Sequence, residues 1–196
     1  IAEKNELYTA KKKDSTGVCF IGERDFDAFL DKYLLSKKGD MINVDTGKKI
    51  SQHHGLYHYT LGQRKGIGIG GVGSGEPWFV VGKDLKKNLL YVAQGEQHEA
   101  LYSTSLIGEA PAWTLDEEPV FPLHCTAKFR YRQQDIPVTV HKMEDGNLHI
   151  VYDNPVKAVT PGQVAVLYDA DICLGSSIIK SIEPVNSKYK YLNPTF

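Results

Sequence analysis

One cysteine lies in a setting that favours reactivity. Cys19 stands between Gly17 and Gly22, after three consecutive lysines at residues 11–13 and the short polar residues 14–16. A free thiol has a pKa of roughly 8.5, so little of it is thiolate near neutral pH unless its surroundings stabilise the anion. Nearby lysines, backbone N–H groups of a glycine-containing turn and the start of a helix predicted downstream all do so. Cys19 is therefore a candidate nucleophile or sulfur carrier.

Two other interpretations of Cys19 stay open on local chemistry. Free cysteine is among the most buried residue types, so Val18, Phe20 and Ile21 could enclose an inert thiol in a short strand. A cysteine hydrolase would instead need His53 or His54 within hydrogen-bond reach of the sulfur. We interpret the two histidines as surface loop residues, because no third and fourth ligand follow at a spacing typical of zinc.

The elements that must position these residues begin with one helix. Phe26, Phe29, Leu30, Tyr33 and Leu34 recur at helical spacing and predict one amphipathic helix that ends near residues 36–40. Four β-segments are then expected, of which the first is a hairpin around a turn at residues 45–47. These segments lie at residues 41–50 (the hairpin), 56–60, 78–84 and 89–92. Together they indicate a small α+β domain.

A glycine-rich segment follows the predicted strand at residues 56–60. Gly66, Gly68 and Gly71 match G-x-G-x-x-G, but the glycines and proline of residues 72–77 prevent the helix that a dinucleotide fingerprint requires. Glycines let a backbone approach a phosphodiester closely, and Gln63, Arg64 and Lys65 lie next to them. We interpret the segment as a phosphate-contacting loop, with a mobile surface loop as the alternative.

From residue 101 the chain is predicted to be almost entirely β. Six strand-like runs separated by turn signals favour a small antiparallel β-barrel, so the predicted fold is mainly β with one amphipathic helix. The runs are residues 101–107, 123–132, 137–142, 148–152, 163–168 and 172–179. In the second run Lys128, Arg130 and Arg132 alternate with apolar residues, which predicts a row of cations on one face for RNA phosphates. Cys125 then points inward.

Bulk properties narrow the class of protein. The 196 residues carry a formal net charge of −1, with 41% hydrophobic and 24% charged residues, as in ordinary globular domains. Any basic surface must therefore be local. Three cysteines without a Cys-x-x-Cys pair, and no apolar run of about 20 residues, predict a cytoplasmic protein without a membrane partner. The start at Ile1, within a predicted helix, indicates a piece of a longer protein.

Several stretches resemble one enzyme family over nearly the whole chain. Residues 14–24 (DSTGVCFIGER) resemble the signature around the sulfur-carrying cysteine of bacterial tRNA 2-thiouridylases, the MnmA/TrmU family. Residues 62–66 (GQRKG), 78–92, 125–133, 159–163 and 173–175 resemble the same family. Its members have a PP-loop ATP-pyrophosphatase domain, a small central domain and a C-terminal β-barrel. The resemblance implies a tail of the first domain at residues 1–25, a central domain at 26–97 and a barrel at 98–196.

The resemblance also implies a reaction and the residues that take part in it. The family replaces the 2-oxygen of the wobble uridine of tRNA with sulfur, using ATP and a cysteine persulfide supplied by a sulfur-relay protein or a cysteine desulfurase. Cys19 matches the cysteine that receives the persulfide. Arg130 and Tyr131 match a tRNA-contacting pair, although strand alternation places them on opposite faces unless a strand ends there. Gln163 matches a further tRNA contact, and Gln63, Arg64, Lys65, Lys128 and Arg132 are weaker candidates.

One departure from the family is large. The Ser-Gly-Gly-x-Asp-Ser phosphate loop of the family does not occur in these 196 residues. We therefore expect ATP, with Mg²⁺, to bind in a missing N-terminal domain, and neither cofactor nor metal to bind here, so that the chain alone is inactive. The alternative is a non-catalytic RNA-binding β module in which Cys19 is structural.

Overall fold

The computed structural model describes residues 3–8, 10–11, 29, 32–34, 36–70, 73–131 and 133–192. The chain divides into two compact units, residues 1–36 and 37–196. In the first unit the described residues include the short 3₁₀ helix η1 (Glu3–Asn5). The amphipathic helix predicted from Phe26 to Leu34 falls mostly outside the described residues, and so do Cys19 and Arg132.

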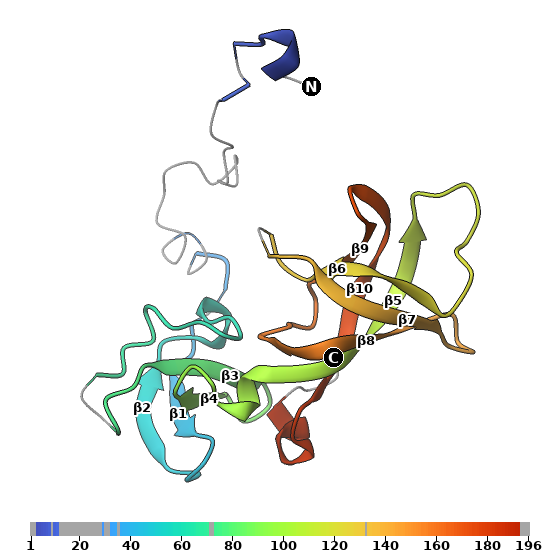
Figure 1. Ribbon diagram of the computed structural model, residues 1–196. Coiled ribbons are helices and arrows are strands. Elements are labelled where there is room, and N and C mark those ends of the chain that lie inside the picture. The colour runs from blue at the N-terminus through green and yellow to red at the C-terminus, as the bar shows by residue number, and fades with distance from the viewer. Residues whose placement is uncertain are drawn as a thin grey trace. The chain divides into compact units, whose positions relative to one another are not determined.

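The second unit begins with a four-stranded sheet in the order β2-β1-β4-β3 (Figure 1). Strands β1 and β4 run parallel, and the other two pairs are antiparallel. The strands are β1 (Gly39–Asn43), β2 (Lys49–His53), β3 (Trp78–Asp84) and β4 (Leu89–Gln94). The β1–β2 hairpin is the predicted one, and the Asn43 side chain closes its turn by accepting hydrogen bonds from the backbone N–H groups of Asp45 and Thr46.

The predicted strand at residues 56–60 is wrong, because the short 3₁₀ helix η2 (Leu56–His58) forms there. Leu56 and Tyr59 are both buried in the apolar cluster on one face of the sheet. Residues three apart lie on the same side of a 3₁₀ turn, whereas in a strand they would point to opposite faces. Burial of both residues on one face therefore favours the helical turn.

A closed antiparallel β-barrel with strand order β10-β5-β8-β7-β6-β9 follows the sheet (Figure 1). Its strands are β5 (Tyr102–Trp113), β6 (Leu123–Lys128), β7 (Ile136–Lys142), β8 (Leu148–Lys157), β9 (Val164–Asp169) and β10 (Ile172–Pro184). Short 3₁₀ helices, η3 (Glu99–Leu101) and η4 (Ser187–Leu192), precede and follow them. The mainly β fold and the barrel predicted from the sequence are confirmed, whereas the one amphipathic helix is not.

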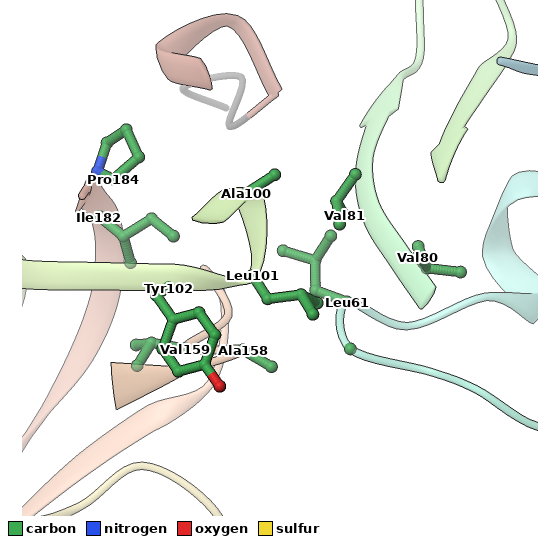
Figure 2. Close-up of a pocket in the computed structure, with 11 residues that line it drawn as sticks. Leu61, Val80, Val81, Ala100, Leu101, Tyr102, Ala158, Val159, Ile182 and Pro184 are labelled. Atoms are coloured by element: carbon green, nitrogen blue, oxygen red, sulfur yellow. The ribbon is translucent and has the colours of Figure 1, made fainter. Parts of the chain in front are cut away.

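The sheet packs through apolar side chains against the two short helices that flank the barrel, η3 and η4. Phe79 and Val81 of the sheet pack with Leu101, Tyr189 and Leu192. On the barrel side of this contact, the N–H of Ala158, which follows β8, donates to the carbonyl of Leu101 in η3 at 2.7 Å. Figure 2 shows the side chains that surround this junction, where the remaining cavity is about 10 Å³. That volume is near the minimum for one water molecule, so the junction is a packed contact and not a ligand site.

Candidate nucleic-acid interface

Strand β6 ends at Lys128, before the end of the predicted run at residue 132. The N–H of Phe129 donates to Oε1 of Gln133 at 2.7 Å, and the N–H of Gln133 donates to the carbonyl of Arg130 at 3.2 Å. These bonds close a turn in place of a further strand pair. The prediction that Lys128 and Arg130 are neighbours in a row along one strand is therefore wrong. The same strand end means that alternation no longer constrains Arg130 and Tyr131.

The turn forms one side of a surface hollow at the rim of the barrel. The hollow brings together four candidate residues of the sequence analysis, namely Lys128, Arg130, Tyr131 and Gln163. Two backbone hydrogen bonds hold the turn that contains Gln163. The N–H of Gln163 donates to the carbonyl of Thr160, and the N–H of Ile179 donates to the carbonyl of Gln163. The remaining residues that line the hollow are Phe129, Gly162, Val164, Val166 and Tyr168.

The floor of the hollow is the outer face of β9. Ala165 and Leu167 point into the barrel core, so Val164, Val166 and Tyr168 face outward. Lys128 pairs with Val166 across the β6–β9 ladder and also lies on the outer face. The hollow is therefore apolar at its base and positively charged at its edge.

Arg130 links the barrel to the sheet. Its Nη2 donates to the carbonyl of Leu61 at 2.7 Å and to Oγ1 of Thr160 at 3.0 Å. Burial lowers the pKa of the Arg130 guanidinium from its ordinary value, but a guanidinium stays charged in proteins. The two bonds use the N–H groups of one terminal nitrogen, out of five N–H donors in the group. Arg130 thus has a structural role besides any contact with a ligand.

The glycine-rich segment lies on the sheet and is partly built into it. Oε1 of Gln63 accepts from the N–H of Thr60 at 2.9 Å, and Nε2 of Gln63 donates to the carbonyl of Lys65 at 2.9 Å. The Gln63 side chain therefore holds its own turn. Arg64 and Lys65 are exposed, and Arg64 lines a second hollow beside Trp78.

Of the two described cysteines, Cys125 lies in surroundings that do not suit a sulfur carrier. Cys125 is half-buried and packs against the barrel core, as strand alternation predicted. Burial, reinforced by the negative charge of Asp169, raises the pKa of Cys125 to about 11. Cys173 is also half-buried, and its carbonyl accepts a hydrogen bond from Thr114 Oγ1. Cys125 is thus a protonated, packed thiol at neutral pH.

The placement of His53 corrects another prediction. His53 is not a surface loop residue: it ends β2, is 1% exposed, and its Nε2 donates to the carbonyl of Asn88 at 3.1 Å. Burial lowers the pKa of His53, and its Nδ1 has no partner among the described residues. The exposed His54 has its Nδ1 3.0 Å from the Tyr59 hydroxyl. No group of three His, Cys, Asp or Glu residues that could hold a metal occurs in the described part of the chain.

Known proteins and domains match almost the entire chain. Residues 27–94 match the model of a tRNA methyl transferase PRC-barrel domain, and residues 103–179 match that of an aminomethyltransferase β-barrel domain. The tRNA-specific 2-thiouridylase MnmA of Listeria monocytogenes serovar 1/2a is 53% identical over 98% of the chain, as are MnmA 2 of Geobacillus kaustophilus and MnmA of Geobacillus thermodenitrificans. In each case the match covers 51% of the relative, so the chain spans about half the length of these relatives.

The two domain matches define the general class first: a PRC-barrel domain of the tRNA methyl transferase type joined to an aminomethyltransferase-type β-barrel. The 53% identity to proteins named tRNA-specific 2-thiouridylase narrows this class to one family. The chain belongs to the tRNA-specific 2-thiouridylase family.

Sequence reasoning missed Tyr168, which lines the hollow, and Thr160, which accepts a hydrogen bond from Arg130. Alternation along residues 163–168 would have placed Val164, Val166 and Tyr168 together on one face, because this strand was itself predicted. Thr160 offered no such signal. It supports Arg130 across the barrel rim, and this contact depends on how two turns meet in space.

Proposed function

We propose that the chain supplies the sulfur-carrying cysteine and part of the tRNA-binding surface of a tRNA-uridine 2-sulfurtransferase. The observation that carries the proposal is the 53% identity over 98% of the chain to proteins named tRNA-specific 2-thiouridylase. The hollow supports it, because Arg130, Tyr131 and Gln163, the three tRNA contacts implied by resemblance, line one surface with Lys128. Cations beside aromatic rings are a common means of holding RNA.

In this proposal Cys19 carries the sulfur as a persulfide that a relay protein or a cysteine desulfurase provides. A carrier thiol must react as its thiolate, and in the sequence Cys19 follows three lysines and lies between Gly17 and Gly22, residue types that favour that form. Cys125 contrasts with it, because burial holds the Cys125 pKa at about 11. The compartment implied by this cysteine usage is a reducing one, in keeping with a cytoplasmic enzyme.

ATP and Mg²⁺ do not fit the described residues. The segment with most glycines, residues 66–75, leads into β3 and not into a helix, so it offers no helix N-terminus to a triphosphate. Within the described residues no cluster of three acidic or other metal-ligating side chains is present for a cation. We therefore propose that ATP binds outside these 196 residues, and that the chain alone does not thiolate tRNA.

The test is peptide-mapped mass spectrometry of the chain after incubation with a cysteine desulfurase and cysteine. We expect one added sulfur on Cys19 and none on Cys125 or Cys173, which are internal controls in the same molecule. A Cys19→Ser variant should carry none. Equal labelling of all three cysteines, or none on Cys19, would contradict a selective carrier.

A second function, RNA binding without chemistry, is favoured by one observation: the hollow is formed by barrel residues that do not depend on Cys19. Substitution of Cys19 by serine in the full-length enzyme separates the two. Continued thiolation would support the RNA-binding module, and its loss would support the carrier.

A further inference from the structure

The outer face of β9 carries an aromatic ring and a neighbouring lysine that the family resemblance does not assign as a pair. The Nζ of Lys128 lies 5.4 Å from the centroid of the Tyr168 ring. Tyr131, which is 70% exposed, lines the same hollow. Val164, also exposed, lies between the turn of Gln163 and the rest of the floor. Two aromatic rings and an exposed valine therefore share one open surface.

The charge around this surface suits a phosphate. Of the described residues that line the hollow, Lys128 and Arg130 are cations and none is a carboxylate. Lys128 has one acidic partner, Asp135, whose Oδ1 lies 3.5 Å from its Nζ. Both side chains of this ion pair are partly exposed, so a phosphate oxygen can replace the carboxylate at small cost.

The shape favours an unstacked nucleotide over a duplex. An A-form RNA helix presents phosphates and sugars, and its base faces are covered by their neighbours in the stack. An apolar floor with an aromatic ring gains little from such a surface. A nucleotide outside a helix offers one open base face to a ring and one phosphate to a cation.

We propose that the hollow binds one unstacked nucleotide of the RNA, with its base against Tyr168 and its phosphate on Lys128. In the free protein the Asp135 carboxylate pairs with Lys128, whose Nζ lies over the Tyr168 ring. On binding, a phosphate oxygen of the nucleotide replaces this carboxylate. This inference rests on the proposed function, because it takes the ligand to be RNA. Beyond that function, it states that the surface selects a nucleotide whose base is not stacked in a helix.

The first test compares two RNAs, an unmodified tRNA transcript and a blunt RNA duplex of the same nucleotide count, each bound to the 196-residue chain. Tyr168→Leu removes the ring but keeps an apolar side chain, and Tyr168→Phe keeps the ring. We expect Tyr168→Leu to weaken tRNA binding about tenfold, as for loss of one stacked base, and to leave duplex binding unchanged. Tyr168→Phe should leave both affinities unchanged.

An equal decrease in affinity for both RNAs, or no decrease for either, would overturn the inference. If the unmodified chain binds tRNA and Tyr168→Leu has no effect, only the nucleotide pocket is wrong. If the wild-type chain binds neither RNA, both the nucleotide pocket and the proposal that this surface binds RNA are contradicted. Thermal unfolding of each variant distinguishes loss of base stacking from loss of the fold.

Asp135→Asn gives an independent test on an exposed position that does not disturb the barrel core. Removal of the competing carboxylate should strengthen tRNA binding about threefold, the size expected for one exposed ion pair. Unchanged or weaker binding would show that Lys128 does not contact a phosphate.

Discussion

The glycine-rich segment and the hollow at the barrel rim contain the same residue types, yet the structure uses them differently. In the segment, Gln63 uses both ends of its amide to bind the backbone of its own turn. At the rim, Gln163 is exposed and its turn is held by backbone bonds, so its side chain is not needed for the turn. Polar residues in a loop can either hold the backbone or present a surface, and hydrogen-bond partners distinguish the two.

Arg130 belongs to both regions. It lines the hollow, while its Nη2 donates to the carbonyl of Leu61 just before the glycine-rich segment. A substitution at Arg130 therefore changes the ligand surface and the join between sheet and barrel together. Loss of tRNA binding in such a variant would not by itself identify a tRNA contact.

The largest effect is expected where the glycine-rich segment touches the barrel. Gly62 has a φ of +77°, and a Cβ added there would lie 2.5 Å from Cβ of Ala158. Left-handed strain and overpacking together should make Gly62→Ala cost about 3 kcal/mol of unfolding free energy, measured by urea denaturation. Gly68→Ala is the matched control, because Gly68 has a φ of +75° with nothing within 4 Å of the added Cβ. It should cost about 1 kcal/mol.

A double-mutant cycle sharpens this prediction. Ala158 itself has a φ of +57°, so Ala158→Gly removes strain as well as the clashing methyl group. In that background Gly62→Ala should cost only about 1 kcal/mol, as at Gly68. A cost of Gly62→Ala that is the same in both backgrounds would show that the two residues do not touch.

A smaller loss of stability is expected at Arg130. Arg130→Ala removes two hydrogen bonds of a charged group to Leu61 and Thr160 and should cost about 2 kcal/mol of unfolding free energy. Arg64→Ala is the control from the other region, since Arg64 is exposed. It should cost less than about 0.5 kcal/mol in the same urea titration. Equal costs would mean that Arg130 is not a link between sheet and barrel.

Much of the fold was predictable because local patterns and tertiary packing agree. The β1–β2 hairpin follows from its turn residues, and the barrel strands follow from alternation between frequent turns. The errors lie where packing overrides the local pattern. Leu56 and Tyr59 look like parts of a strand, but both are buried on one face of the sheet, so a 3₁₀ turn forms.

The candidate site was predictable in its members and not in its geometry. The resemblance nominated Arg130, Tyr131 and Gln163, and they line one hollow. The predicted row of cations is wrong because a side chain, that of Gln133, ends β6 by accepting the hydrogen bond of the Phe129 N–H that a strand would have used. Such a bond between a side chain and the backbone has no periodic signature in the sequence.

The smallest expected effect is a change in the salt dependence of tRNA binding, and it distinguishes which of the two regions contacts the RNA backbone. Removal of one cation that neutralises a phosphate should lower the slope of log affinity against log salt by about 0.7, so we expect that decrease for Lys128→Ala and for Arg64→Ala. Lys142 is the control, since it is paired with Glu118 as Lys128 is with Asp135, but it lies at the far end of β7 from the hollow. Lys142→Ala should leave the slope of tRNA binding unchanged. An unchanged slope in Arg64→Ala alone would confine the interface to the barrel rim, because only a cation that displaces counterions from the RNA contributes to this slope.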